Sequence, residues 1–371
     1  MAAWKETIRQ RLELQSKQIE DVLARHRVTA VVTGGMVYSR AFDFRVEGPT
    51  RRVSNRLAAL KREMAEVLGV PMVEIICQEE RMVVRVMQWN SYPLQLLELM
   101  KMVGQVRPLT MILGAAADGR PLLLHLPSAD VSNMLVVGSE GAGKTSLLRA
   151  LLFSLAARNK QHQFQALVID YDPAARAGEP CDGPLAAFTH LPHLVEPVAT
   201  TLERAVQALD FLVEELNYRQ NNEINSPKIF LVVDNLDSLL AAGQDPLLYR
   251  LVRLLQYGEQ VGIHLVLGLE KPAGPYTDKI LKCDLPVRFI GRVRNEKMAR
   301  AAAGILETGA EQLQGQGDFI AINAGRQFRF QTAYISDYDL FLAVEKLSRV
   351  KQKRIVVRTA DFRPGLVGIA G

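Results

Sequence analysis

The sequence has few cysteines and no long apolar run, and both absences narrow the class of protein. Its three cysteines, Cys77, Cys181 and Cys283, are odd in number and far apart, which favours a reducing compartment over a disulfide framework. His190 and His193 lie near Cys181 but have no fourth ligand at a suitable spacing, so we expect no zinc site. No stretch approaches the ~18 uninterrupted apolar residues of a membrane-spanning helix, and the charged N-terminus lacks a signal-peptide core. We therefore expect a cytoplasmic protein with no membrane span.

Net charge is small over most of the chain, and the excess of basic residues gathers at the C-terminal end. The formal net charge is +5, but from Lys346 onward there are seven basic residues against one acidic residue, Asp361. Such a tail is typical of a contact with nucleic acid or an anionic surface, and equally of a solvated terminus. The overall composition, 48% hydrophobic and 23% charged over 371 residues, is that of a folded protein with two or three domains.

The order of apolar runs predicts two kinds of architecture along the chain. An amphipathic helix near the N-terminus is followed by β-rich runs at 28–33 and 41–46, a helix at 53–68 and a strand at 72–77, which indicates a small α+β domain. A predicted β-hairpin at 111–126 leads into the second part. There, helices alternate with strands at 134–137, 165–169, 229–233, 264–269 and 287–290. This alternation indicates a mostly parallel sheet covered by helices on both faces.

The strongest motif is a glycine-rich loop between a predicted strand and a predicted helix. Residues 138–145 read GSEGAGKT, a full match to the phosphate-binding pattern GxxxxGK[ST]. In such a loop the backbone N–H groups face the phosphates, and the following helix adds its N-terminal dipole. We expect Lys144 to contact the β- and γ-phosphates of ATP and Thr145 to bind Mg²⁺. The predicted cofactor-binding residues are Gly138, Ser139, Glu140, Gly141, Ala142, Gly143, Lys144, Thr145 and Ser146.

A second motif supplies the other half of a nucleotide site. The apolar run 229–233 ends in Asp234, and such a strand provides the carboxylate that holds magnesium through water. The next residue is Asn235, where ATP-driven motors usually place a glutamate. An amide can orient the attacking water but cannot take its proton, and loss of a general base costs about 10²–10⁴ in rate.

These motifs and several further segments resemble the FtsK/SpoIIIE family of hexameric DNA translocases, over about residues 18–347. The further segments are 52–68, 191–219, 262–272, 280–288 and 309–318. The resemblance implies an α/β fold, a RecA-like P-loop motor with a mostly parallel sheet, preceded by a small α+β domain. It also implies a hexamer around double-stranded DNA with ATP bound between subunits. The expected divisions are an N-terminal helix at 1–17, the α+β domain at 18–105, the motor at 106–347 and a basic tail at 348–371, without the family's membrane segment or winged-helix domain.

The resemblance also implies where DNA would be held. The segment 271–282 corresponds to a loop that faces the channel of the ring, so Lys271, Lys279 and Lys282 are candidate contacts to DNA phosphates. The alternative is that they are ordinary surface lysines. The segment 220–227 is shorter than the family's DNA-gripping loop, which suggests that grip is weaker or differently supplied.

Several residues depart from the family pattern at the expected catalytic positions. Glu270 stands where the family has a sensor glutamine, and the strand that it ends should lie between the P-loop strand and the Asp234 strand. We therefore consider Lys144, Asp234, Asn235 and Glu270 as catalytic candidates, with Glu270 as the group that activates water.

Two other residues depart from the family pattern. Glu259 stands in place of an arginine that reaches the neighbouring subunit's ATP, and Ala174 stands in place of a lysine. The role of that arginine would then fall to Arg253, Arg292, Arg294 or Arg300. An absent trans arginine can cost several powers of ten in rate.

Three functions follow from this reading. The leading one is an ATP-dependent translocase of double-stranded DNA acting as a hexameric ring. The second is an ATP-gated DNA-binding ring with impaired hydrolysis, or a passive subunit beside an active related one; Asn235, Glu259 and Ala174 favour it. The third is a secretion ATPase that moves protein, because one motor fold serves different substrates.

Overall fold

The chain divides into two compact units, and each is described by itself. The computed structural model describes residues 2–37, 41–48, 50–70, 72–78, 81–87, 93–116, 119–126, 131–174, 183–306 and 308–349. The first unit comprises Met1–Pro93 with Ala117–Arg120, and the second comprises Leu94–Ala116 with Pro121–Gly371. Cys181 and most of the predicted basic tail, from residue 350 onward, lie outside the described residues.

The first unit is a four-stranded antiparallel sheet packed against two helices. Its elements are α1 (Ala2–Arg25), β1 (Val31–Val37), β2 (Ala41–Glu47), α2 (Thr50–Leu68), β3 (Val73–Gln78) and β4 (Arg81–Met87). The strand order is β1-β2-β4-β3. Apolar side chains of both helices and of the sheet, such as Ile19, Phe44 and Met64, form its core. Across the sheet Asp43 accepts two hydrogen bonds of 2.7 Å from Arg85, and this ion pair neutralises the buried carboxylate.

The second unit is built on one nine-stranded sheet with the order β6-β5-β13-β12-β11-β7-β10-β9-β8. Its strands are β5 (Thr110–Ala116), β6 (Pro121–His125), β7 (Met134–Val137), β8 (Phe164–Asp170), β9 (Lys228–Asp234), β10 (Ile263–Leu269), β11 (Val287–Ile290), β12 (Asp318–Asn323) and β13 (Arg326–Thr332). The neighbours from β11 to β8 are all parallel, whereas β12, β13, β5 and β6 extend the sheet in antiparallel pairs.

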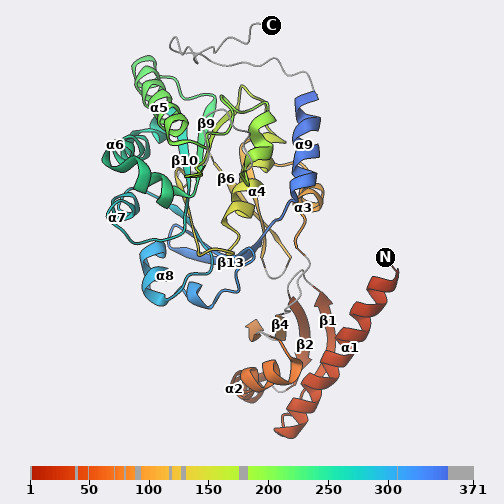
Figure 1. Cartoon of the computed structure of the whole chain (residues 1–371). Coiled ribbons are helices and arrows are strands. Elements are labelled where there is room, and N and C mark those ends of the chain that lie inside the picture. The colour runs from red at the N-terminus through yellow and green to blue at the C-terminus, as the bar shows by residue number, and fades with distance from the viewer. Residues whose placement is uncertain are drawn as a thin grey trace. The chain divides into compact units, whose positions relative to one another are not determined.

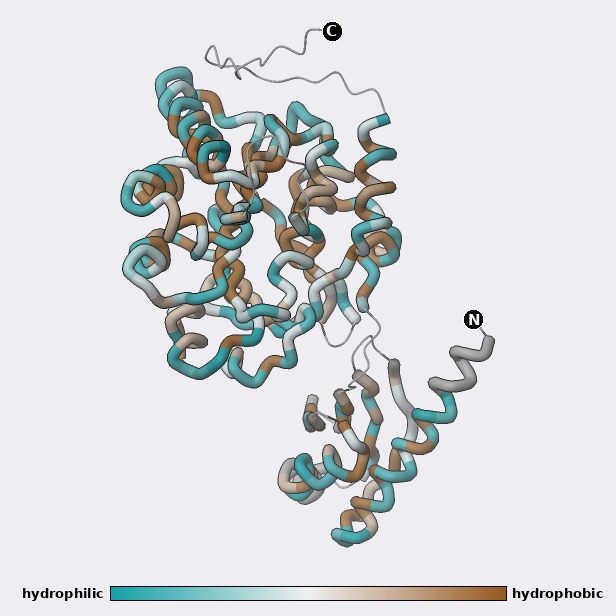
Figure 2. The backbone as a smooth tube through the Cα atoms, viewed as in Figure 1, coloured by the Kyte–Doolittle hydropathy of each residue, from teal (hydrophilic) through white to brown (hydrophobic). Residues whose placement is uncertain are grey.

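Helices cover both faces of the parallel strands, as the sequence predicts (Figure 1). The helices are α3 (Leu96–Val103), α4 (Lys144–Ala156), α5 (Leu202–Asn222), α6 (Leu236–Tyr257, kinked at Gln244), α7 (Thr277–Leu281), α8 (Glu296–Ala303) and α9 (Asp337–Arg349). One hydrophobic core joins the sheet to α3, α4 and α9, and a second joins its other face to α5, α6 and α8. Strands covered on both faces read as continuous apolar runs, and β8, β10 and nearly all of β9 are buried. Figure 2, which colours the backbone by hydropathy, shows brown, hydrophobic segments in the interior of this unit.

The structure adds elements that the sequence analysis does not contain. The parallel strands and the β5–β6 hairpin agree with the predicted runs, but β4, β12 and β13 are absent from that reading. Helix α3 packs into the core of the second unit. The two units are defined by the packing of residues within each of them. They do not test the expected domain divisions at 18–105 and 106–347, which stay predictions. None of the helices in the described part of the chain is both long enough and apolar enough to cross a membrane.

Candidate nucleotide site

The glycine-rich loop joins β7 to α4 in a tight turn that requires glycine. Gly141 and Gly143 have φ values of 73° and 101°, in the left-handed region that L side chains rarely adopt. A Cβ on Gly143 would lie 2.6 Å from the backbone nitrogen of Gly317, so the loop packs backbone to backbone against a distant segment. Gln316 and Gly317 also donate hydrogen bonds of 2.8 Å to the carbonyls of Gly141 and Ala142.

Helix α4 presents its N-terminus to this loop. The hydrogen bond from Leu147 N to Gly143 O, 3.1 Å, closes the first turn, so the N–H groups before it have no acceptor within the helix. Unpaired N–H groups and the helix dipole together attract anions. The Lys144 ammonium donates to Gly138 O at 2.7 Å, which places its positive charge across the mouth of the loop. The arrangement suits a polyphosphate.

Thr145 and Asp234, which are 89 residues apart in sequence, meet at the site. The Thr145 hydroxyl donates to Asp234 Oδ2 at 2.6 Å, and Asp234 is only 1% exposed at the end of β9. A hydroxyl and a carboxylate are the hard oxygen donors that Mg²⁺ prefers. In the described part of the chain no group of three His, Cys, Asp or Glu side chains could hold a metal by itself. The pair therefore fits an ion that shares its coordination with water and phosphate oxygens.

The two remaining catalytic candidates lie beside this pair. Strand β10 lies between β7 and β9, which confirms the strand position expected for Glu270. Glu270 is half-buried, whereas Asn235 is exposed, has a φ of 55° and donates its backbone N–H to Asp234 Oδ1 at 2.9 Å. Asp237, which the sequence analysis does not single out, accepts hydrogen bonds from the backbone nitrogens of Glu270 (2.6 Å) and Lys271 (3.2 Å). Burial raises the pKa of Asp237, and these bonds oppose the shift. Asp237 thus ties the end of β10 to the first turn of α6.

A further buried carboxylate adjoins the site. Asp170 ends β8 in register with Asp234 and accepts a hydrogen bond of 2.9 Å from Leu185 N. Burial raises the pKa of Asp170 from 3.8 to about 6, and the negative charge of Asp234 adds to the shift. The sequence contains the signal, an aspartate ending a buried strand beside the Asp234 strand.

The raised pKa of Asp170 predicts a pH-dependent gain in stability on substitution. Because the folded state disfavours the ionised carboxyl, its contribution to stability is complete below about pH 4 and is lost as the pH rises through about 6. We expect Asp170→Asn, which keeps an acceptor for Leu185 N, to raise the free energy of unfolding by about 3 kcal/mol at pH 8 and hardly at pH 4. Urea unfolding without nucleotide at both pH values measures this, with Asp284→Asn, at an exposed aspartate, as the control. An equal effect at both pH values would contradict it.

The three DNA candidates lie on an exposed segment at and around α7. Lys271, Lys279 and Lys282 are all exposed. Lys279 pairs with Asp245 at 3.3 Å, a contact between two exposed side chains that adds little stability. Their role in DNA binding stays a prediction.

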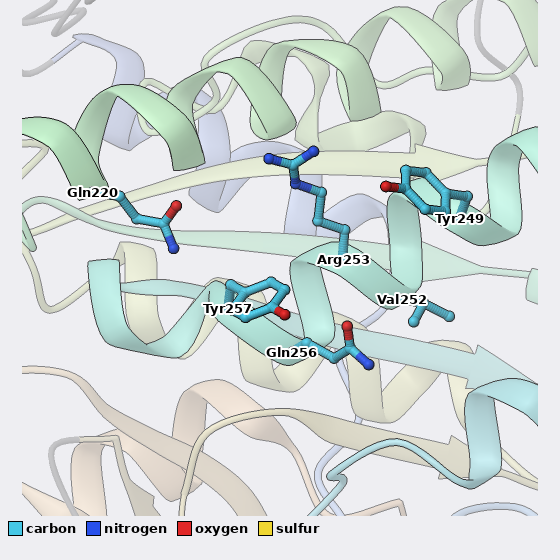
Figure 3. Close-up of a pocket in the computed structure, with 6 residues that line it drawn as sticks. All are labelled: Gln220, Tyr249, Val252, Arg253, Gln256 and Tyr257. Carbon is cyan, nitrogen blue, oxygen red and sulfur yellow. The ribbon is translucent and has the colours of Figure 1, made fainter.

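The four arginines expected to replace the missing trans arginine have different surroundings. Arg253 of α6 donates to Asn217 of α5 at 2.6 Å and lines a surface pocket of about 420 Å³. Figure 3 shows it there with Gln220, Tyr249, Val252, Gln256 and Tyr257. Arg294 is exposed just before α8, and Arg300 is exposed within it. Arg292 contacts the phosphate-binding loop of its own chain, because its carbonyl accepts a hydrogen bond of 2.8 Å from Ser139 N.

Comparison with known proteins agrees with this geometry. Residues 94–230 match the model of the FtsK/SpoIIIE family. Similar curated proteins include the DNA translocases FtsK of Streptomyces avermitilis, 24% identical over 366 residues, and of Mycobacterium tuberculosis, 26% identical over 365 residues. Each alignment covers 88% of this chain but only 39% and 42% of those relatives, so the chain spans about two-fifths of their length.

Solved structures confirm the predicted P-loop motor fold. The pCW3 conjugation coupling protein TcpA, in its monomer form with ATPγS, has a TM-score of 0.57 at 15% identity, covering 91% of this chain and 99% of that one. The cytoplasmic domain of the Thermomonospora curvata type VII secretion ATPase EccC has a TM-score of 0.55 at 21% identity, covering 69% and 34%. At these identities the likeness establishes the fold.

Proposed function

We propose that this chain, whose residues 94–230 match the FtsK/SpoIIIE family, is an ATPase that binds Mg-ATP and moves double-stranded DNA as a hexameric ring. The observation that carries the nucleotide part is the hydrogen bond of 2.6 Å between Thr145 and the buried Asp234. It brings together, from two distant motifs, the two oxygen donors that a phosphate-bound magnesium ion needs. The names of the curated relatives support DNA as the substrate.

In this proposal each residue has a defined task. The N–H groups at the start of α4 and the Lys144 ammonium bind the phosphates, and Thr145 and Asp234 hold the magnesium ion, which when bound neutralises charge on the phosphates. Glu270, one strand from Asp234, orients the attacking water and takes its proton. Asn235 lacks a basic group, so general-base catalysis rests with Glu270.

A second function is favoured by one observation. Asn235 directly follows Asp234 and is exposed, in a left-handed backbone conformation. Its side chain is an amide, which can orient a water molecule but cannot take its proton. If no residue of the chain acts as the base, the chain is an ATP-gated DNA-binding ring or the passive subunit of a mixed motor. Steady-state ATP hydrolysis with and without long duplex DNA separates these functions. Stimulation by DNA supports the motor, ATP-dependent DNA binding without turnover supports the ring, and indifference to DNA at physiological salt contradicts both.

The proposed DNA segment predicts a change in salt dependence. We expect the triple variant Lys271→Ala, Lys279→Ala, Lys282→Ala to weaken duplex binding and to flatten the plot of log affinity against log salt by about 0.9 per lost phosphate contact. Lys279 contributes least because it already pairs with Asp245. Fluorescence anisotropy at several salt concentrations measures the slope, and the exposed Lys297→Ala on α8 is the control. An unchanged slope would show that the three lysines are ordinary surface residues without a role in DNA binding.

A further inference from the structure

Arg292 is held beside the phosphate-binding loop by the strand next to it. Strand β11 pairs in parallel with β7, and Ile290 lies opposite Val137 at the ends of the two strands. The ladder continues beyond them, because Gly291 N donates to Val137 O at 2.7 Å and Ser139 N donates to Arg292 O at 2.8 Å. The backbone of Arg292 is therefore fixed against the second residue of the loop.

The side chain of Arg292 packs beside the same loop. A Cβ built on Gly315 would lie 3.5 Å from both Nε and Cζ of Arg292, and 3.1 Å from Gly141 O. The guanidinium, Gly315 and the loop residue Gly141 thus lie close together. Because Gln316 N donates to Gly141 O at 2.8 Å, the surface on which the guanidinium rests is itself bonded to the loop.

The positive charge of Arg292 has no partner within the described part of the chain. Within residues 131–174 and 183–349, leaving out residue 307, no acidic side chain pairs with Arg292 and its guanidinium makes no hydrogen bond. Nearby arginines differ, since Arg329 pairs with Asp318 at 2.9 Å and Arg288 bonds to three backbone carbonyls. A fixed, exposed and unpaired cation beside an anion-binding loop is placed to bind an anion.

The order of the strands indicates which part of the nucleotide Arg292 faces. Thr145 and Asp234 meet on the side of β7 that carries β10 and β9, so magnesium and the terminal phosphate belong on that side. Arg292 follows β11, on the opposite side of β7. We propose that Arg292 binds, within its own chain, the nucleoside-proximal phosphate of ATP or ADP. This proposal rests on the proposed nucleotide function and separates Arg292 from a trans arginine, which would act on the terminal phosphate.

Nucleotide titration of variants tests the assignment. Fluorescent ATP and ADP analogues are titrated into the wild-type protein and into Arg292→Gln, Arg292→Lys and the control Arg326→Gln, an exposed arginine at the start of β13. A lost charge-assisted hydrogen bond predicts that Arg292→Gln weakens ATP and ADP alike by about 10- to 100-fold. Arg292→Lys should recover part of the loss, and Arg326→Gln should bind both nucleotides as the wild type does.

Three results would overturn the proposal, and they are distinguishable. If wild-type protein binds ATP and Arg292→Gln binds it equally well, Arg292 has no role in nucleotide binding. If Arg292→Gln binds normally but loses kcat, and mixing it with a Lys144→Ala subunit restores hydrolysis, Arg292 acts on a neighbouring subunit instead. If the wild-type protein binds neither nucleotide, the proposed function itself fails. Thermal unfolding of each variant confirms that the exposed substitutions leave the fold intact.

Discussion

Replacing Thr145 by Val is expected to lower kcat for ATP by about 10²–10³, and adding Asp234→Asn to it should lower kcat hardly further. Each single change removes one oxygen donor from a shared magnesium site, and residues that act as a unit are strongly non-additive. The hydrogen bond of 2.6 Å between the two side chains is the structural basis for this coupling. Initial rates over a range of Mg²⁺ concentrations measure it, because the single variants should also require more magnesium.

The neighbouring Ser146→Ala is the matched control for this experiment. Ser146 follows Thr145 at the start of α4 and is not hydrogen-bonded to Asp234. Its loss should change the magnesium requirement far less than Thr145→Val does. Fully additive losses in the Thr145 and Asp234 double variant would show that the two residues do not serve one ion.

Glu270→Gln is expected to lower kcat by about 10²–10⁴ without a comparable loss of ATP affinity, because it removes the general base and keeps the size of the side chain. Glu214→Gln, at an exposed glutamate of α5, is the control. Rapid-quench assays with saturating ATP separate the chemical step from binding.

If Glu270→Gln does not change the rate of ATP hydrolysis, the variant Asn235→Glu separates the two remaining explanations. An inactive wild-type protein that gains hydrolysis through Asn235→Glu would be a nucleotide-gated ring that lost its base at position 235. An active wild-type protein insensitive to Glu270→Gln would contradict the assignment of Glu270 and leave the motor function standing.

The sequence predicts the phosphate-binding half of the site well because that half is local. The residues from Gly138 to Ser146 are contiguous, and their glycines and lysine carry the chemistry in their own spacing. The apolar run before Asp234 predicts a buried strand for the same reason. The resemblance to the FtsK/SpoIIIE family then places the strand before Glu270 between the P-loop strand and the Asp234 strand, which the fold confirms.

The remaining contacts join residues far apart in sequence, and no local pattern reports them. Asp237 bonds to the backbone after β10, Asp170 lies opposite Asp234 on the neighbouring strand, and the carbonyl of Arg292, after β11, bonds to the loop. Each depends on which strands pair and in which register, and pairing is settled by the packing of the whole sheet. The hairpin of β12 and β13 is absent from the sequence-based expectations, although its residues carry strand patterns: β12 has a buried apolar run, and β13 alternates polar and apolar residues.

The close approach of Gly143 and Gly317 restricts how this protein can vary. A Cβ at Gly143 would meet the backbone of Gly317, and one at Gly317 would meet the side chains of Thr332 and Gln331 at 2.6 and 2.7 Å. Gly143 cannot accept a larger residue unless the backbone at Gly317 shifts, and the φ of 89° at Gly317 disfavours any residue other than glycine there. The two loops, 174 residues apart, must therefore change together during evolution, and a designer who exchanges the phosphate-binding loop must also transplant the segment that supports it.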